Sequence, residues 1–301
     1  MKSLLQIAIL ATLVFVRATT ATAQLTPNDG KSAGGGDCAQ NTYNCMATPN
    51  PLPKADTIWL EKMTWMDVRD AMAAGKKTVI IAAGGIEPNG PWVTLGKHNW
   101  ISETNCEAIA KVLGDALCAP IVPFVPEGSI EPRSGHMLTM GTISLEQATY
   151  QALITDIVRS FKANGFERIF LIGDSGGNIK GMQAVAAKLS DAKTLVAAIP
   201  EYYNYDQIDQ MLAGKGVWAP GSVSRDEGLH DNVATTLNIM INRRDEVRLD
   251  QRIKAGKASL AGVSFADKEA SLKLARELIA FRTKTTVDAM RKVIASRAQA
   301  K

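Results

Sequence analysis

TVIIAAGGIEPNGPWVTLGKHN, residues 78–99, decides the fold class of this 301-residue chain. Its first six residues form an apolar, partly β-branched run, which is typical of a strand buried on both faces. The glycine-rich stretch that follows places Glu87, Asn89 and His98 in a loop after this strand. Ligands bind beyond the carboxyl ends of the strands in open α/β sheets. A carboxylate, a carboxamide and an imidazole there indicate one part of a metal or acid–base site.

Strands and helices alternate along the rest of the chain. Thr64 can cap a helix that runs to about Ala74, and Gly75 can end it. Further strands are expected at residues 119–126, 168–172 and 195–199, and further helices at 102–113, 145–164, 178–189 and 268–298. This order predicts a three-layer α/β/α sandwich with a mainly parallel sheet.

The N-terminal segment 1–23 has the features of a signal peptide. Lys2 precedes a short apolar core at residues 4–16, and small residues at 21–23 precede Gln24. The core is too short to span a bilayer comfortably, so we expect cleavage near Ala23–Gln24 and a periplasmic or secreted protein. Residues 24–56 are rich in Gly, Pro, Asn and Ser and are expected to form a flexible leader to a single α/β domain at 57–301.

The charge balance points to no polyanionic partner. The formal net charge is +4, and the segment 1–23 contributes two of the positive charges, Lys2 and Arg17. We therefore expect neither a nucleic-acid nor a membrane partner.

Four cysteines in an exported chain suggest disulfides. Cys38 and Cys45 can close a small loop in the leader, and we expect a bridge there. Cys106 and Cys118 are expected to be buried thiols, because a helix running to about Gly114 would separate them by roughly 12 Å. A bridge would form only if that helix ended early.

Four motifs, in order and spacing, resemble those of the creatininase (creatinine amidohydrolase) family over roughly 59–245. Members carry Glu-x-His-Gly-Pro-His-x-x-x-x-x-Asp after the first strand; this chain has Glu87-Pro88-Asn89-Gly90-Pro91-Trp92, with His98 at the aspartate position. The family segments His-x-x-x-Pro-Gly-Thr, Asn-Gly-His-Gly-Gly-Asn and His-Ala-Gly-x-x-Glu correspond to residues 136–142, 173–178 and 226–231.

The resemblance implies a creatininase-like fold, a two-metal centre, cyclic or lactam-like small-molecule substrates and homo-oligomers, often hexamers. This chain departs from the family at the metal ligands. Glu87 is kept, but Asn89, His98 and Ser175 replace a histidine, the bridging aspartate and a second histidine. New polar residues lie in or beside the same motifs, which favours an altered site over an inactive one.

Candidate metal ligands follow from the residue types. The chain has only three histidines, His98, His136 and His230, and all lie in motif segments. Glu87 and His98 offer one oxygen and one nitrogen to a single zinc or manganese ion, with Asp174 or Asp231 as a third ligand. We expect one ion rather than two per chain, with Glu87, His98 and Asp174 as its ligands. Each of these residues can instead have a structural role, such as capping a helix.

Proton transfer and substrate binding are assigned to neighbouring residues. His136, His230 and Asp231 are candidates for proton transfer. The backbone amides of Gly176 and Gly177, before a helix N-terminus, could bind an anionic or carbonyl oxygen. The remaining substrate-binding candidates are Asn89, Asn178 and Arg133. Asn89 could alternatively tie a tight turn.

Ser175 lies in Gly173-Asp174-Ser175-Gly176-Gly177, which satisfies Gly-x-Ser-x-Gly, the nucleophile elbow of α/β-hydrolases. The order Ser175, Asp226, His230 fits such a triad, although the last two are only four positions apart, whereas hydrolase triads usually draw them from separate loops. The expected function is an exported metal-dependent hydrolase acting on an amide or cyclic amide C–N bond of a small polar substrate. The alternatives are a serine-type hydrolase using Ser175 and a non-catalytic ligand-binding protein.

Overall fold

The computed structural model describes residues 32–33, 36–217 and 228–299, and the segment 1–23 expected to be a signal peptide lies outside them. The chain divides into two compact units, residues 1–53 and 54–301. In the first unit, the described residues form the short 3₁₀ helix η1 (Thr42–Asn44). The expected Cys38–Cys45 disulfide is present beside this helix.

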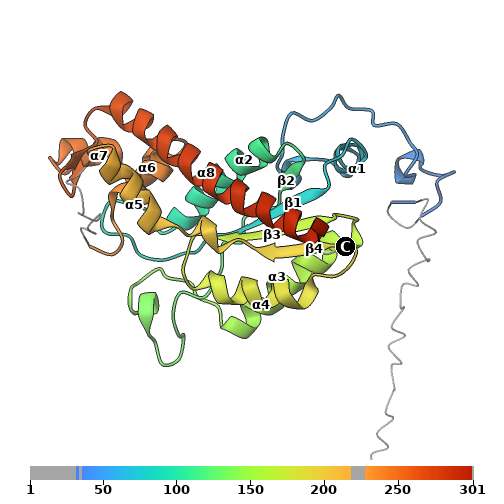
Figure 1. The fold of residues 1–301 in the computed structure, drawn as a ribbon, viewed down its shortest axis with the longest axis horizontal. Coiled ribbons are helices and arrows are strands. Elements are labelled where there is room, and N and C mark those ends of the chain that lie inside the picture. The colour runs from blue at the N-terminus through green and yellow to red at the C-terminus, as the bar shows by residue number, and fades with distance from the viewer. Residues whose placement is uncertain (1–31, 34–35, 218–227, 300–301) are drawn as a thin grey trace, which may run out of the picture. The chain divides into compact units, whose positions relative to one another are not determined.

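The second unit is built on a parallel sheet of four strands. In the order β2-β1-β3-β4, these are β2 (Ala116–Cys118), β1 (Thr78–Ala83), β3 (Arg168–Gly173) and β4 (Leu195–Ala198). Every residue of β1 is buried and pairs in register with β3, from Thr78 opposite Arg168 to Ala83 opposite Gly173. The expected mainly parallel sheet is confirmed (Figure 1).

Helices cover both faces of this sheet, as the burial of every residue of β1 requires, because successive side chains of a strand point to opposite faces. Val79 and Ile81 pack against α1 (Trp65–Ala73), α3 (Gln147–Ala163) and α4 (Asn178–Leu189). Ile80 and Ala82 pack on the other face against α2 (Lys97–Leu113) and the long helix α8 (Lys268–Gln299). Figure 1 shows α3 and α4 on one side of the sheet and α2 and α8 on the other, so the three-layer α/β/α architecture is confirmed.

A third apolar cluster lies at one end of α8. It joins α5 (Tyr205–Gly214), α6 (Val233–Met240) and α7 (Leu249–Lys254), with the hairpin of β5 (Ser259–Leu260) and β6 (Val263–Ser264). The remaining 3₁₀ turns are η2 (Leu60–Lys62), η3 (Gly135–Leu138), η4 (Pro200–Tyr202) and η5 (Arg244–Val247). No helix in the described ranges combines the length and apolar character needed to cross a membrane.

Capping residues and prolines explain which expected elements form and which do not. Thr64 caps α1 in a capping box with Asp67, as expected. The expected strand 119–126 is wrong, because β2 ends at Cys118 and only isolated bridges at Val122 and Val125 follow. Prolines at 120 and 123 supply no backbone donor, which explains why a continuous ladder does not form there.

Helix α2 begins at Lys97, five positions before the expected start at Ser102. His98 therefore lies on the first turn of a helix rather than in the loop. A helix starting here also means that Glu87 does not cap a start at Ser102, the structural alternative considered for it.

The expectation of free thiols at Cys106 and Cys118 is wrong: they form a disulfide with a Cα–Cα distance of 6.2 Å. Helix α2 does run to Leu113, but the chain reverses at Gly114 and β2 returns beside the helix. A return of four residues at about 3.3 Å each cancels the separation that the helix creates. The error lay in counting the outward path alone.

Candidate active site

Polar side chains from six segments meet beyond the carboxyl ends of β1 and β3. They come from the loop after β1, the first turn of α2, the loop 127–143, the turn after β3, the segment 203–209 and the segment 228–235. The cavity between them measures about 270 Å³ and is lined by Glu87, Lys97, His98, His136, Asp174, Ser175, Gly176, Tyr203, Tyr205, Asp209, His230, Asn232 and Thr235. This is where an open parallel sheet binds its ligands.

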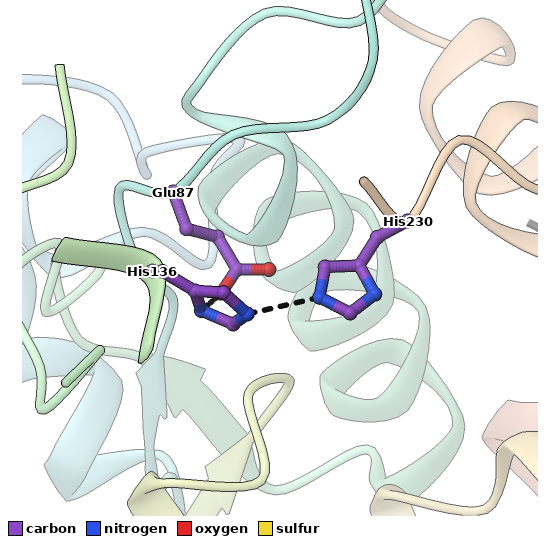
Figure 2. Close-up of side chains that lie close together, drawn as sticks. All are labelled: Glu87, His136 and His230. Carbon is purple, nitrogen blue, oxygen red and sulfur yellow. Dashed lines mark hydrogen bonds and ion pairs between the residues drawn. The ribbon is translucent and has the colours of Figure 1, made fainter. Parts of the chain in front are cut away.

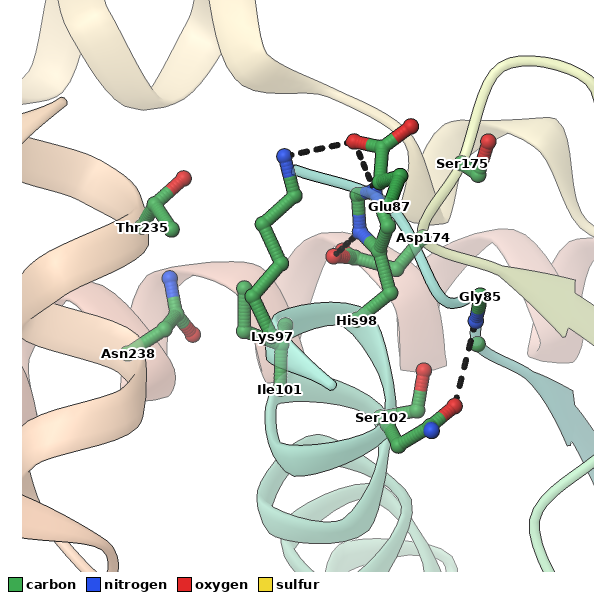
Figure 3. Close-up of polar contacts among 12 residues, drawn as sticks. Gly85, Glu87, Lys97, His98, Ile101, Ser102, Asp174, Ser175, Thr235 and Asn238 are labelled. Carbon is green, nitrogen blue, oxygen red and sulfur yellow. Dashed lines mark hydrogen bonds and ion pairs between the residues drawn. The ribbon is translucent and has the colours of Figure 1, made fainter. Parts of the chain in front are cut away.

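Glu87 is the central acid of this cavity, with only 2% of its surface exposed. Its Oε1 accepts from Lys97 Nζ at 2.7 Å and lies 2.9 Å from His98 Nε2 (Figure 3). Burial alone would raise the pKa of Glu87, but the hydrogen bonds and charges of His98 and Lys97 outweigh it and hold that pKa well below its usual range. Glu87 is therefore ionised.

His98 is clamped between two carboxylates. Its Nδ1 lies 2.7 Å from Asp174 Oδ2, on the opposite side of the ring from Glu87. Asp174 is fully buried, which would raise its pKa, but the charge of Arg282 and the hydrogen bond to His98 lower it to about 2. Because both acids are ionised acceptors, both ring nitrogens of His98 are engaged as their partners.

Glu127 brings a second carboxyl group close to Glu87. Gly85 permits this approach, because a Cβ there would overlap the Glu127 carboxylate. Burial and the negative charge of Glu87 raise the pKa of Glu127 to about 9. Ser175 donates its hydroxyl hydrogen to Glu127 Oε2 at 3.2 Å.

His136 and His230 face each other across the mouth of the cavity. Their Nε2 atoms lie 3.0 Å apart, and their rings meet edge to face with centroids 5.0 Å apart. His136 Nδ1 also contacts Glu87 Oε2 (Figure 2), but neither atom is aligned for a hydrogen bond. Burial lowers the pKa of His136 despite the opposing charge of Glu87, which favours the neutral imidazole that binds metals.

Two groups of side chains could hold a metal ion within the described part of the chain: Glu87, His136 and His230, or Glu87, His98 and Glu127. Each residue offers one ligand atom within 4.8 Å of the others. The first group fits better, because Glu87 Oε2 and His136 Nδ1 are buried without hydrogen-bond partners. Both ring nitrogens of His98, by contrast, are already engaged.

Other predicted metal-site and acid–base residues have structural partners. Asp174 lies on the far side of His98 from Glu87 and belongs to neither metal-binding group. Asp231 is buried against Arg252, whose Nη2 lies 2.6 Å from its Oδ1, and does not line the cavity. Asp226, the acid proposed for a serine-type triad, lies outside the described residues.

Of the predicted substrate-binding residues, Gly176 lines the cavity and the others do not. Asn89 donates to the backbone carbonyls of Glu87 and Thr94, so its amide ties the loop, as the alternative assignment foresaw. Asn178 is also buried and donates to the carbonyls of Ala83 and Gly84. Gly177 packs against the carbonyl of Pro126.

Arg133, the last of these candidates, donates to the carbonyl of Met137 within its own exposed loop. It therefore stabilises the loop that carries His136.

Three charged residues of the site were missed by the sequence reasoning. Lys97 precedes His98 in the quoted stretch, and a lysine next to a candidate ligand could have been considered. Glu127 follows the apolar run 119–126, which was expected to be a strand, so it could have been considered in the same way as Glu87. Arg282 lies in the middle of a long helix, and no local pattern connects it to the cavity.

Comparisons with known proteins identify the family of this chain. The sequence model of the family described as "Creatininase: Creatinine amidohydrolase" matches residues 61–289. A curated creatinine amidohydrolase from Pseudomonas putida is 21% identical over 169 residues, which cover 53% of this chain and 64% of that protein. The chain thus spans somewhat less than two thirds of this curated relative.

Two solved structures are similar over 79% of this chain and 98% of their own length. One is a mutant creatininase described as a Zn-Zn type, at 19% identity and a TM-score of 0.56. The other is described as creatininase Mn, at 20% identity and a TM-score of 0.55. At this identity the likeness supports the fold.

Proposed function

Because the chain belongs to the creatininase family, we propose that it is a hydrolase that uses one divalent metal ion, zinc or manganese, to cleave an amide or cyclic amide C–N bond. Its substrate is a small polar molecule that fits the cavity of about 270 Å³. The convergence of Glu87, His136 and His230 on this cavity carries the proposal. Creatinine, named for the relatives, is one candidate among small cyclic amides.

The ligands of this ion differ from those expected from sequence. Glu87 Oε2, His136 and His230 supply a carboxylate oxygen and two imidazole nitrogens, a donor set typical of catalytic zinc sites. Glu87 can offer only one oxygen, because its Oε1 is occupied by Lys97 and His98. This occupancy supports one ion rather than two per chain.

Bound there, a divalent ion supplies Lewis acidity that lowers the pKa of water toward about 7. The chain provides the other groups that hydrolysis needs. The raised pKa of Glu127, about 9, keeps its carboxyl protonated near neutrality. Glu127 itself does not line the cavity, but the Ser175 hydroxyl that contacts it does, so a proton from Glu127 can reach the leaving nitrogen through this hydroxyl. Lys97 and Gly176 line the cavity, and we propose that the Lys97 ammonium and the Gly176 backbone amide stabilise negative charge on the carbonyl oxygen.

Elemental analysis and a substrate screen test the proposal. Protein purified without chelator is expected to hold about one divalent ion per chain, lost in His136→Ala and in His230→Ala. The loaded protein is then incubated with small linear and cyclic amides, and mass spectrometry detects addition of one water. A folded protein that binds no ion under metal-replete conditions contradicts the proposal.

The two alternatives make different predictions in the same experiments. In the serine-type reading, a fluorophosphonate labels Ser175 and chelators leave activity intact. The structure lends this reading little support, since the Ser175 hydroxyl donates to an acid, Glu127, instead of to a histidine base. A non-catalytic binding protein would retain a ligand without turnover and hold no stoichiometric metal.

The proposal extends to location and assembly. We propose export, with cleavage near Ala23–Gln24, and a homo-oligomeric state in solution. Mass spectrometry of the mature N-terminus and analytical ultracentrifugation test these two points directly.

A further inference from the structure

The guanidinium of Arg282 is fully buried near the middle of α8 and is not among the groups that line the cavity. Its Nη2 donates to Asp174 Oδ1 at 2.5 Å, and its Nε donates to the carbonyl of Tyr202 at 3.0 Å. The guanidinium also stacks over the Tyr202 ring, 4.0 Å from its centroid. These contacts fix its position from three directions.

Asp174 passes this constraint on to the cavity. Its Oδ1 faces Arg282 and its Oδ2 faces His98 Nδ1 at 2.7 Å, while the Tyr205 hydroxyl donates to both oxygens at 3.1–3.2 Å. The other ring nitrogen of His98 then meets Glu87 Oε1. A line of four side chains thus runs from α8 to the central acid of the site.

The carboxylate of Asp174 lies between the Arg282 guanidinium and the His98 ring, the ring lies between the carboxylates of Asp174 and Glu87, and all four side chains are buried. Neither Arg282 nor Asp174 exposes its side chain, and His98 exposes 7% of its side chain. A carboxylate this deeply buried needs a permanent cation beside it, since an unpaired charge there is strongly unfavourable. Arginine meets this need because it remains charged and presents rigid donors.

We propose that Arg282 is a positioning residue that acts through Asp174 to hold the His98 ring against Glu87. It contacts neither substrate nor metal. The inference rests on the proposed function only in that Glu87 is taken as a metal ligand. Hydrogen-bonded partners of a metal ligand typically change metal affinity about 10–100-fold when removed.

Histidine NMR tests the positioning without metal or turnover. The chain has three histidines, so metal-free protein labelled with nitrogen-15 histidine gives few ring signals. In Arg282→Met, we expect the two ring-nitrogen signals of His98 to shift markedly while those of His230 remain near their original positions. Arg282→Lys, which keeps the charge but not the fork of donors, is expected to restore the signals only in part.

Arg168→Met is the matched control. Arg168 is the first residue of β3, and it pairs with Asp115 at 2.6 Å. Asp174 directly follows the last residue of this strand, so the two arginine–aspartate pairs lie at its opposite ends. Loss of Arg168 also removes an arginine–aspartate pair, but far along the strand from the cavity. We expect all three histidines to keep their signals in this variant.

Zinc titration provides a second measurement. We expect the zinc dissociation constant to rise about tenfold in Arg282→Met and to stay unchanged in Arg168→Met. A folded Arg282→Met protein with wild-type His98 signals overturns the inference. Wild-type zinc affinity in that variant, where the wild-type protein binds zinc, also overturns it.

Two further outcomes are distinguishable. If Arg282→Met does not fold, the double variant Arg282→Met/Asp174→Asn removes both charges together and avoids an unpaired buried ion. Unchanged His98 signals in that double variant overturn the inference. If the His98 signals shift as expected but wild-type protein binds no metal, the positioning role stands and the proposed function fails.

Discussion

Breaking the Cys106–Cys118 disulfide should destabilise the larger unit of the chain by about 3 kcal/mol. The bridge spans 12 positions and joins α2 to β2, and both half-cystines are fully buried. Loop-closure entropy for a ring of this size corresponds to about 3 kcal/mol at 25 °C. With a urea m-value of about 2–3 kcal/mol per molar for a large domain, the midpoint should fall by about 1 M.

Urea unfolding of wild type and Cys106→Ala/Cys118→Ala, each with and without reductant, measures this difference. The control is Cys38→Ala/Cys45→Ala, which removes a bridge of separation 7 from the smaller unit. The control should leave the unfolding of residues 54–301 unchanged. Two titratable thiols in unreduced, unfolded Cys38→Ala/Cys45→Ala protein would refute the reasoning, as would a midpoint shift below about 0.2 M between wild type and the Cys106→Ala/Cys118→Ala variant.

The other predictions concern charges around the cavity. Lys97→Met leaves Glu87 without its ammonium partner and should lower the free energy of unfolding, measured in urea, by about 3 kcal/mol. The control is Lys111→Met, which breaks an exposed pair with Glu107 on the same helix and should lower it by under about 0.5 kcal/mol. The pKa of Asp174 is lowered from 3.8 to about 2, so its contribution of about 2 kcal/mol is present above about pH 4 and is lost as pH falls toward 2. Unfolding of Asp174→Asn should therefore depend less steeply on pH over this interval, and an identical slope would contradict the assignment. Arg133→Ala should leave the metal content unchanged, because the side chain of Arg133 donates to the carbonyl of Met137 in its own exposed loop. Loss of the ion in that variant would contradict this prediction and would indicate that Arg133 contributes to metal binding.

The architecture was predictable because its signals are local and repeated. The run at 78–83 is fully buried, as its apolar composition predicted, and Thr64 caps α1 as expected. Where tertiary contacts decide, local signals failed. The prolines after Cys118 shortened the second strand, and α2 started at Gly96-Lys97 with no side-chain cap to mark it.

The sequence predicted which residues gather at the cavity better than it predicted which of them could bind metal. All three histidines and Glu87 do line one cavity, which their positions in motif segments indicated. Asp174 and Glu87 contact different ring nitrogens of His98 because of how α2, the turn after β3 and α8 pack together. The spacing of residues in the sequence does not predict this packing. Asp174 therefore looked like a ligand in the sequence, yet it lies on the opposite ring nitrogen of His98 from Glu87.

The position of Arg282 on the last helix has a consequence for biosynthesis. Arg282 lies 108 positions after Asp174, so a ribosome adds it long after the motif segments around the cavity. Until Arg282 is added, Asp174 lacks its cationic partner. In a nascent chain or a truncated product, the Asp174 carboxylate that contacts His98 is therefore not held by Arg282. Organisation of the cavity is thereby tied to the synthesis of α8, and fragments that end before this helix would carry the motif loops without an organised centre.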